Sequence, residues 1–175
     1  MFQEYIKNYN KILSKVENVE KALKLIKLFK KNKKKKILIF GNGGSSSIAS
    51  HIATDFTKEC KIKTLNFNDH NLITCFANDY GFENWIKKTI ENFCDYKNDL
   101  VILISSSGNS KNMIKAANFC KKCKIDLVTL TGFEKNNPVS KKGKVNIWVN
   151  SKSYNYVEVS HLQILAFIVD HLKID

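Results

Sequence analysis

Five short apolar runs alternate along the chain with longer segments of helical periodicity, and this alternation constrains the fold most. The runs are residues 37–40, 62–67, 100–104, 127–130 and 145–149. The expected helices span residues 4–31 (as one helix or as two broken near Glu17 and Asn18), 46–59, 71–76, 82–93, 109–123 and 157–172, with a turn at residues 78–81. Strands that alternate with helices form parallel sheets covered on both faces. We predict an α/β fold with a five-stranded parallel sheet in the flavodoxin-like order 2-1-3-4-5.

The length of 175 residues fits one domain. We predict a single domain over residues 1–175, with a helical segment at 1–35 and an α/β core at 36–175. The strongly apolar last helix is expected either in the core or at a subunit interface. No apolar run reaches the roughly 18 residues of a membrane span. The first residues also lack the pattern of a signal peptide. We therefore expect a cytoplasmic protein.

The net charge of +13 suggests nucleic acid at first sight. However, the basic residues are all lysine, and aromatic side chains do not interleave with them as on a stacking platform. The densest lysine run, at residues 30–36, falls at an expected helix end, where positive charge is favourable. The five cysteines are odd in number and irregularly spaced, and the pair Cys120 and Cys123 has no second pair to complete a zinc site. We expect neither nucleic-acid binding nor a disulfide framework.

Two serine-rich segments stand where expected strands pass into helices. The first is Gly41-Asn42-Gly43-Gly44-Ser45-Ser46-Ser47, and the second is Ser105-Ser106-Ser107-Gly108-Asn109-Ser110. A helix start offers free N–H groups and the positive end of the helix dipole, and serine hydroxyls add neutral donors. In the order 2-1-3-4-5, strands one and three are neighbours, and ligands bind at that switch point. We predict that both segments converge on one phosphate.

Two other kinds of phosphate-binding loop need residues that these segments lack. A dinucleotide fingerprint would need glycine at the position of Ser46 and an acidic residue after strand two, where only Asp69 could serve. A P-loop would need Gly-Lys-Ser/Thr, which the sequence lacks. Serine and asparagine caps beside glycine turns remain the alternative without a ligand. Two such loops at one switch point favour a site.

These loops, with His51 after the first of them, resemble the sugar isomerase (SIS) domain, in its phosphoheptose isomerase branch. The likeness extends through residues 78–82, residues 130–132 and the helix from Glu158. The resemblance implies a homotetramer or homodimer with active sites at subunit interfaces. It implies isomerisation of a sugar phosphate such as sedoheptulose 7-phosphate for bacterial lipopolysaccharide. The residues predicted to bind the substrate are Asn42, Gly43, Ser45, Asp79, Ser105, Ser106, Ser107 and Ser110.

Aldose–ketose isomerisation moves a proton between adjacent carbons and needs a base and an acid. His51 and Asp55 are spaced i, i+4, and Glu158 and His161 are spaced i, i+3, so each pair can share a helix face. We predict Asp55 as the base and His161 or His51 as the acid, with Glu158 also in the catalytic set. The four side chains are of types that bind zinc, which is therefore a candidate cofactor.

The last helix departs from the family pattern, which has a glutamine and, eight residues later, a histidine. Glu158 stands at the glutamine position, and the histidine position holds Ala166. On the helix expected at residues 46–59, Asp55 stands where the family pattern has a glutamate, which has a longer side chain. Two functions remain open at this point: a phosphosugar isomerase, or a phosphosugar-binding or regulatory SIS protein with reduced catalysis, which Ala166 favours.

Overall fold

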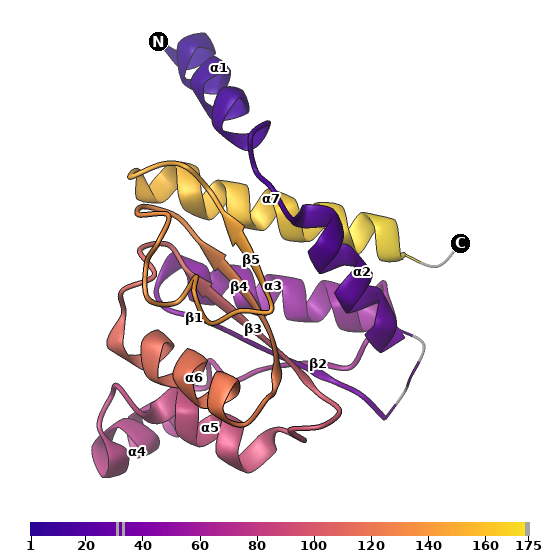
Figure 1. Ribbon diagram of the computed structural model, residues 1–175, viewed down its shortest axis with the longest axis vertical. Helices are drawn as coiled ribbons and strands as arrows, with labels where there is room; N and C mark the ends of the chain where they lie inside the picture. The colour runs from indigo at the N-terminus through magenta and orange to yellow at the C-terminus, as the bar shows by residue number, and fades with distance from the viewer. Residues whose placement is uncertain (31, 33, 174–175) are drawn as a thin grey trace.

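A computed structural model describes residues 1–30, 32 and 34–173 (Figure 1). The elements in chain order are α1 (Phe2–Leu13), α2 (Val19–Lys30), β1 (Ile37–Gly41), α3 (Gly44–Lys58), β2 (Thr64–Asn66), α4 (His70–Tyr80), α5 (Trp85–Phe93), β3 (Leu100–Ser105), α6 (Lys111–Lys122), β4 (Asp126–Thr131), β5 (Val145–Trp148) and α7 (Tyr154–Leu172). The five strands pair in parallel in the order β2-β1-β3-β4-β5. The predicted fold class and strand order are confirmed.

The sheet separates two apolar cores because alternate residues of a strand point to opposite faces. In β1, Ile37 and Ile39 join a core with α2, α3 and α7, whereas Leu38 and Phe40 join a core with α5 and α6. All five β1 residues are buried, as expected for a strand covered on both sides. Figure 1 shows α7 and α3 on one side of the sheet and α5 and α6 on the other. The carboxyl ends of β1 and β3 are thus fixed side by side.

Two differences from the predicted elements have a clear local cause, and one of the two alternatives for the N-terminal segment is found. The expected strand at 62–67 is only Thr64–Asn66, because Lys61 takes a positive φ of 56° and Ile62 still donates its N–H to the carbonyl of Phe56. The predicted turn at 78–81 is wrong for its first three residues. There α4 continues to Tyr80 and ends at Gly81, whose φ is 83°. The N-terminal segment forms two helices, and Asn18, with φ 67°, lies in the break.

The last helix, α7, has one buried face, which packs in the core with α2 and α3. The opposite face leaves Val159 and Phe167 exposed on this chain, so α7 is partly in the core, and its predicted place at a subunit interface stays a prediction. The helix α1 projects from the body of the molecule in Figure 1, and Tyr9 ties it to α7 by donating its hydroxyl to Gln163 Oε1 at 2.6 Å. Within the described ranges, no helix combines the length and the apolar character that a membrane crossing requires.

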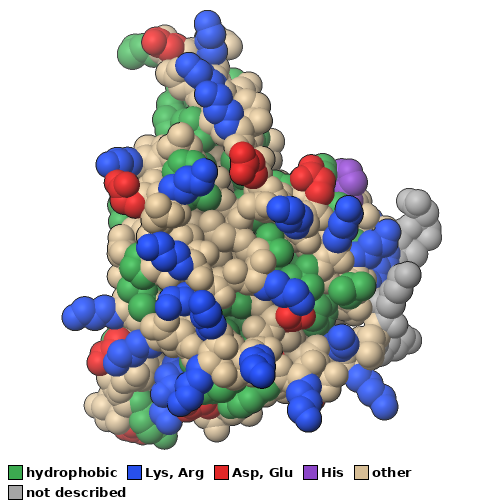
Figure 2. All heavy atoms as spheres, in the orientation of Figure 1, with side chains coloured by type: hydrophobic (Ala, Val, Ile, Leu, Met, Phe, Trp, Pro, Cys, Tyr) green, Lys and Arg blue, Asp and Glu red, His purple; other side chains and the backbone are tan. Residues whose placement is uncertain are grey.

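Lysine side chains are dispersed over the face of the molecule shown in Figure 2, with acidic residues among them. In the lysine run at 30–36, Lys31 and Lys33 lie outside the described residues. Lys30 donates its ammonium to the carbonyl of Leu172 at 2.7 Å, so it anchors the end of α2 to the end of α7. Lys36 pairs with the buried Asp99. Part of this run therefore has a structural role.

Candidate functional site

The two serine loops converge on one small cavity at the carboxyl edge of the sheet. The cavity has a volume of about 90 Å³ and is lined by Asn42, Ser45, Ile104, Ser105, Ser106, Ser107, Ser110, Tyr154 and Glu158. The strands explain this convergence, since Gly41 at the end of β1 is in register with Ile104 near the end of β3. Each loop then leads into a helix, α3 or α6, whose N-terminus faces the same edge.

The first loop is held in place by close backbone packing and by an amide pair. Asn42 and Asn112 exchange two hydrogen bonds, of 3.0 and 2.9 Å, so the loop after β1 is tied to the first turn of α6. At Gly41 a Cβ atom would lie 2.1 Å from the carbonyl oxygen of Ser45. The chain can turn from β1 into α3 only because this side chain is absent.

The second loop is supported from behind by the connection between β4 and β5. Gly132 donates its N–H to the carbonyl of Ser106 at 2.8 Å, and Val139 donates to the carbonyl of Gly108 at 3.3 Å. Gly108 has a φ of 64°, and a Cβ there would lie 1.9 Å from Asn137 Oδ1. The hydroxyl-bearing loop is therefore fixed by its backbone, which leaves its side chains available to a ligand.

Ser106 supplies the strongest indication of a ligand. Its residue is only 5% exposed, and among the described residues its Oγ has no hydrogen-bond partner. A buried hydroxyl without a partner costs about 1–3 kcal/mol, so such groups are rare unless a ligand or water satisfies them. The hydroxyl belongs to a residue that lines the cavity. Among the described residues no lysine lines the cavity, so an anion would be held there by hydroxyls and helix N-termini.

Glu158 and Tyr154 complete the wall of the cavity from α7. The carboxylate of Glu158 lies against Gly44, the first residue of α3, where any Cβ would be 2.2 Å from Oε2. The positive end of the α3 dipole is a favourable place for a carboxylate. Tyr154 was not predicted from the sequence, because its spacing of four residues from Glu158 gives a shared helix face but not the place of that face in the fold. Its ring packs on Phe133, with centroids 4.8 Å apart.

Several predicted site residues lie elsewhere on this chain. Gly43 caps α3 and is exposed, and Asp79 is exposed on α4, with Oδ2 3.8 Å from the Cys75 sulfur. His51 and Asp55 contact each other, with Nε2 3.3 Å from Oδ2, and the His51 side chain is 61% exposed. None of these four residues lines the cavity. Their predicted roles remain predictions.

The structure does not support the predicted catalytic role of His161, because the ring is enclosed in the core. The residue is fully buried, and its Nε2 lies 3.2 Å from the carbonyl oxygen of Thr131, to which it must donate a hydrogen. Burial lowers the pKa of His161 to about 4, with the Thr131 carbonyl acting weakly in the other direction. The imidazole is therefore neutral at pH 7, and on this chain it does not line the cavity.

The four predicted zinc ligands are not brought together in this chain. Across residues 1–30, 32 and 34–173, no three His, Cys, Asp or Glu side chains cluster closely enough to hold a metal ion. His51 and Asp55 pair on α3, whereas His161 is buried against β4. The four side chains therefore do not form a zinc site within the described part of one chain, and zinc stays a prediction. The cysteines are free thiols, and burial raises the pKa of Cys120.

The burial of His161 predicts a dependence of stability on pH. Its pKa in the folded state, about 4, lies below the ordinary value of 6.5. The stabilisation gained by burying the neutral His161 side chain is therefore complete above pH 6.5, and it is lost as the pH falls toward 4. We expect this residue to lower the free energy of unfolding by up to about 1.4 kcal/mol per pH unit in that window. Urea unfolding at pH 7, 6, 5 and 4 measures this slope.

The control for this slope is His161→Gln, whose amide can donate to the same carbonyl but does not titrate. The variant should show a flatter dependence of stability on pH between 6.5 and 4. An unchanged slope in the variant would assign the acid sensitivity to other groups.

Comparison with known proteins agrees with this geometry. The SIS domain family model matches residues 4–132. The chain belongs to the SIS domain family. This SIS domain is 35% identical to the phosphoheptose isomerase of Fusobacterium nucleatum over 162 residues, covering 90% of this chain and 81% of the relative. It is 34% identical to the phosphoheptose isomerase of Helicobacter pylori, covering 79% of this chain and 74% of the relative.

Solved structures show the same likeness for the SIS domain described here. The phosphoheptose isomerase of Neisseria gonorrhoeae superimposes with a TM-score of 0.88 at 26% identity, covering 98% of this chain and 95% of that one. The likeness therefore includes the N-terminal helices as well as the sheet. The expected resemblance to the SIS family is confirmed.

Proposed function

We propose that this SIS domain is a phosphosugar isomerase that interconverts an aldose and a ketose phosphate, with sedoheptulose 7-phosphate as the first substrate to test. The proposal is supported by relatives named phosphoheptose isomerase at 35% and 34% identity. The single structural observation that carries it is the buried, unpartnered hydroxyl of Ser106, which belongs to a cavity lined by serines from two strand-to-helix loops. A phosphate oxygen is an acceptor to which this hydroxyl could donate its hydrogen.

The cradle would bind the phosphate group without a positively charged side chain. Ser45 comes from the first turn of α3, and Ser110 caps α6. Both helices present their positive ends at this edge, and Ser105–Ser107 add hydroxyls between them. A cavity of about 90 Å³ corresponds to roughly three water volumes. That space suits a phosphate group, with the carbon chain of the sugar leaving through the mouth.

Turnover tests the function directly. The protein is incubated with sedoheptulose 7-phosphate, and the formation of an aldoheptose 7-phosphate is followed by NMR. Catalytic conversion supports the proposal. The absence of any conversion at high enzyme concentration, together with retained ligand binding, contradicts it.

Ser106→Ala should weaken the binding of the phosphorylated sugar. Removing one hydroxyl that bonds a charged phosphate should cost about 1.5–3 kcal/mol of binding free energy, or roughly 10- to 150-fold in Kd. The affinity for the same sugar without phosphate should not change. Calorimetry with both ligands checks this, and Ser47→Ala, at an exposed position of α3, is the matched control. Equal losses for both sugars would place the phosphate elsewhere.

A second candidate function is a SIS protein that binds phosphosugars without efficient catalysis. Ala166 favours it, because this position lacks the histidine of the family pattern. Tight binding of sedoheptulose 7-phosphate with no turnover would support this reading over the isomerase.

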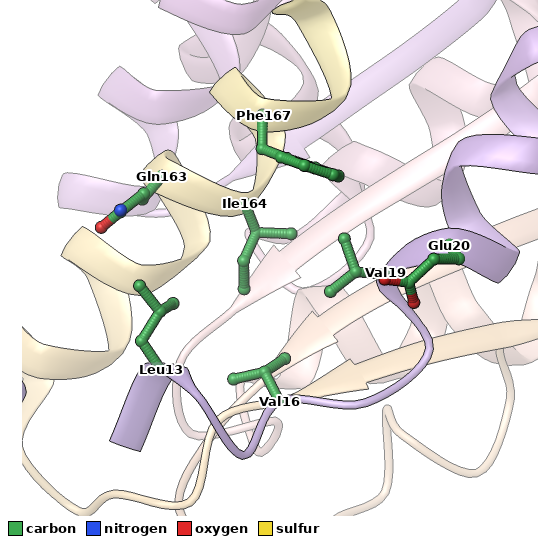
Figure 3. A pocket seen from close by; sticks show the side chains of 7 residues that line it. All are labelled: Leu13, Val16, Val19, Glu20, Gln163, Ile164 and Phe167. Atoms are coloured by element: carbon green, nitrogen blue, oxygen red, sulfur yellow. The ribbon is translucent and has the colours of Figure 1, made fainter. Parts of the chain in front are cut away.

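We also propose that the chain assembles as a homotetramer or homodimer. An apolar groove of about 240 Å³ lies between the α1–α2 region and α7, and Figure 3 shows Leu13, Val16, Val19 and Ile164 pointing into it. The projecting α1 also exposes Phe2 and Tyr5. Light scattering should give a multiple of the 20.1 kDa chain mass. In such an assembly the exposed His51–Asp55 pair could act across a subunit boundary.

A further inference from the structure

We propose that Glu158 and Tyr154 form the acid–base pair that moves the proton in the isomerisation, in place of the histidine missing at position 166. This inference rests on the proposed isomerase function and names its chemistry. The observation that carries it is the composition of the cavity wall. Of the nine lining residues, seven are serine, asparagine or isoleucine, and Glu158 and Tyr154 alone carry ionisable side chains.

The two side chains come from consecutive turns of one helix. Tyr154 begins α7 and Glu158 follows it at i+4, so both lie on the helix face that closes the cavity. Tyr154 is 57% exposed and Glu158 is partly buried, which places them at the mouth rather than at the floor. The buried Ser105 and Ser106, each 5% exposed, mark the floor. A sugar whose phosphate occupies the floor would pass both α7 side chains on its way out.

Both groups are held in place by contacts with other parts of the chain. The carboxylate of Glu158 fills the space over Gly44, where a side chain of any size would collide with it. The ring of Tyr154 leans on Phe133, with an interplanar angle of 56°. Since the serine cradle is neutral, Glu158 is the one charged group that lines the cavity.

The proton transfers balance with these two residues alone. The Glu158 carboxylate takes the proton from C-1 of the ketose, the C–H electron pair becomes the C-1=C-2 bond, and the carbonyl oxygen at C-2 takes the phenol proton of Tyr154. The Tyr154 phenolate then takes the proton from the C-1 hydroxyl, C-1 becomes the carbonyl, and protonated Glu158 delivers its proton to C-2. The aldose leaves with both side chains restored. Each step is general acid–base catalysis through an enediol.

The test compares Glu158→Gln with Asp55→Asn in the same turnover assay. We expect Glu158→Gln to lower kcat by 10²- to 10⁴-fold. Its Kd for sedoheptulose 7-phosphate should be unchanged or lower, because a charge that repels phosphate is removed. Glu59→Gln, at the end of α3, is the matched control. A Glu158→Gln variant that turns over within threefold of the parent, with Asp55→Asn inactive, would overturn the assignment.

Two further readouts separate a chemical role from a structural one. In D₂O the parent protein should incorporate deuterium at C-2 of the aldose, and Glu158→Gln should not. Tyr154→Phe, which keeps the ring on Phe133, should lower kcat at least 10-fold without weakening substrate binding. Tyr96→Phe is its control. If the parent protein turns over and Tyr154→Phe matches it, the phenol has no role. If the parent protein neither isomerises nor exchanges this proton, the proposed function fails together with this inference.

Discussion

Replacement of Gly41 by alanine is expected to abolish phosphate binding and to destabilise the fold. A Cβ at this position would lie 2.1 Å from the carbonyl oxygen and 2.2 Å from the carbonyl carbon of Ser45, and 2.6 Å from the backbone nitrogen of Ser46. These are backbone atoms of the first turn of α3, so no side-chain rotation can relieve the collision. The turn must move away from β1, which removes Ser45 from the cavity. We expect a loss of about 3 kcal/mol in the free energy of unfolding.

Urea denaturation and calorimetry with a sugar phosphate measure the two effects of Gly41→Ala. Ser47→Ala, exposed in the same helix, should retain both stability and affinity. Normal ligand binding by Gly41→Ala would contradict the proposal that the close contact between Gly41 and Ser45 positions the cavity.

Replacement of Asp99 by alanine should have the largest effect on stability outside the site. Asp99 is 2% exposed and accepts from the backbone N–H of Lys36 at 3.1 Å and of Asp95 at 2.7 Å, and it also pairs with the Lys36 ammonium. Alanine would leave these donors without a partner beside buried strands. Breaking a buried ion pair by removing one partner typically costs about 3–5 kcal/mol.

The matched control for Asp99 is Asp126, another acidic residue beside the start of a strand. Asp126 pairs with Lys144 at 2.8 Å, but the two side chains are 37% and 58% exposed. Asp126→Ala should therefore change the free energy of unfolding by less than about 1 kcal/mol. Equal losses for the two variants would mean that the Asp99 carboxylate is hydrated rather than enclosed.

The sheet was predictable because its strands are buried on both faces and therefore appear as continuous apolar runs. Ile37–Phe40 and Leu100–Ile104 are such runs, and glycine or serine follows each at the point where a ligand-binding loop begins. The weakest strand prediction was the one with least apolar character. In residues 62–67 only Thr64–Asn66 pairs with β1, because the positive φ of Lys61 and the hydrogen bond from Ile62 to Phe56 hold the first residues out of the sheet.

The site was predictable where it depends on strand order and was missed where it depends on helix rotation. The spacing of Glu158 and His161 fixes the angle between their side chains around the helix axis. It does not show which of the two side chains faces the core. The structure places that boundary between them, so Glu158 reaches the cavity and His161 packs against β4. Tyr154 was missed for a related reason. It precedes the apolar stretch of α7, and only the fold shows that this end of the helix meets the serine loops.

The reciprocal hydrogen bonds between Asn42 and Asn112 have a consequence for the kinetics of release. Each amide is both donor and acceptor for the other, so the two hydrogen bonds join the segment after β1 to the start of α6. A bound anion cannot leave by the outward swing of a single segment. Its residence time should therefore follow the strength of the hydroxyl contacts, and it should be insensitive to solvent viscosity.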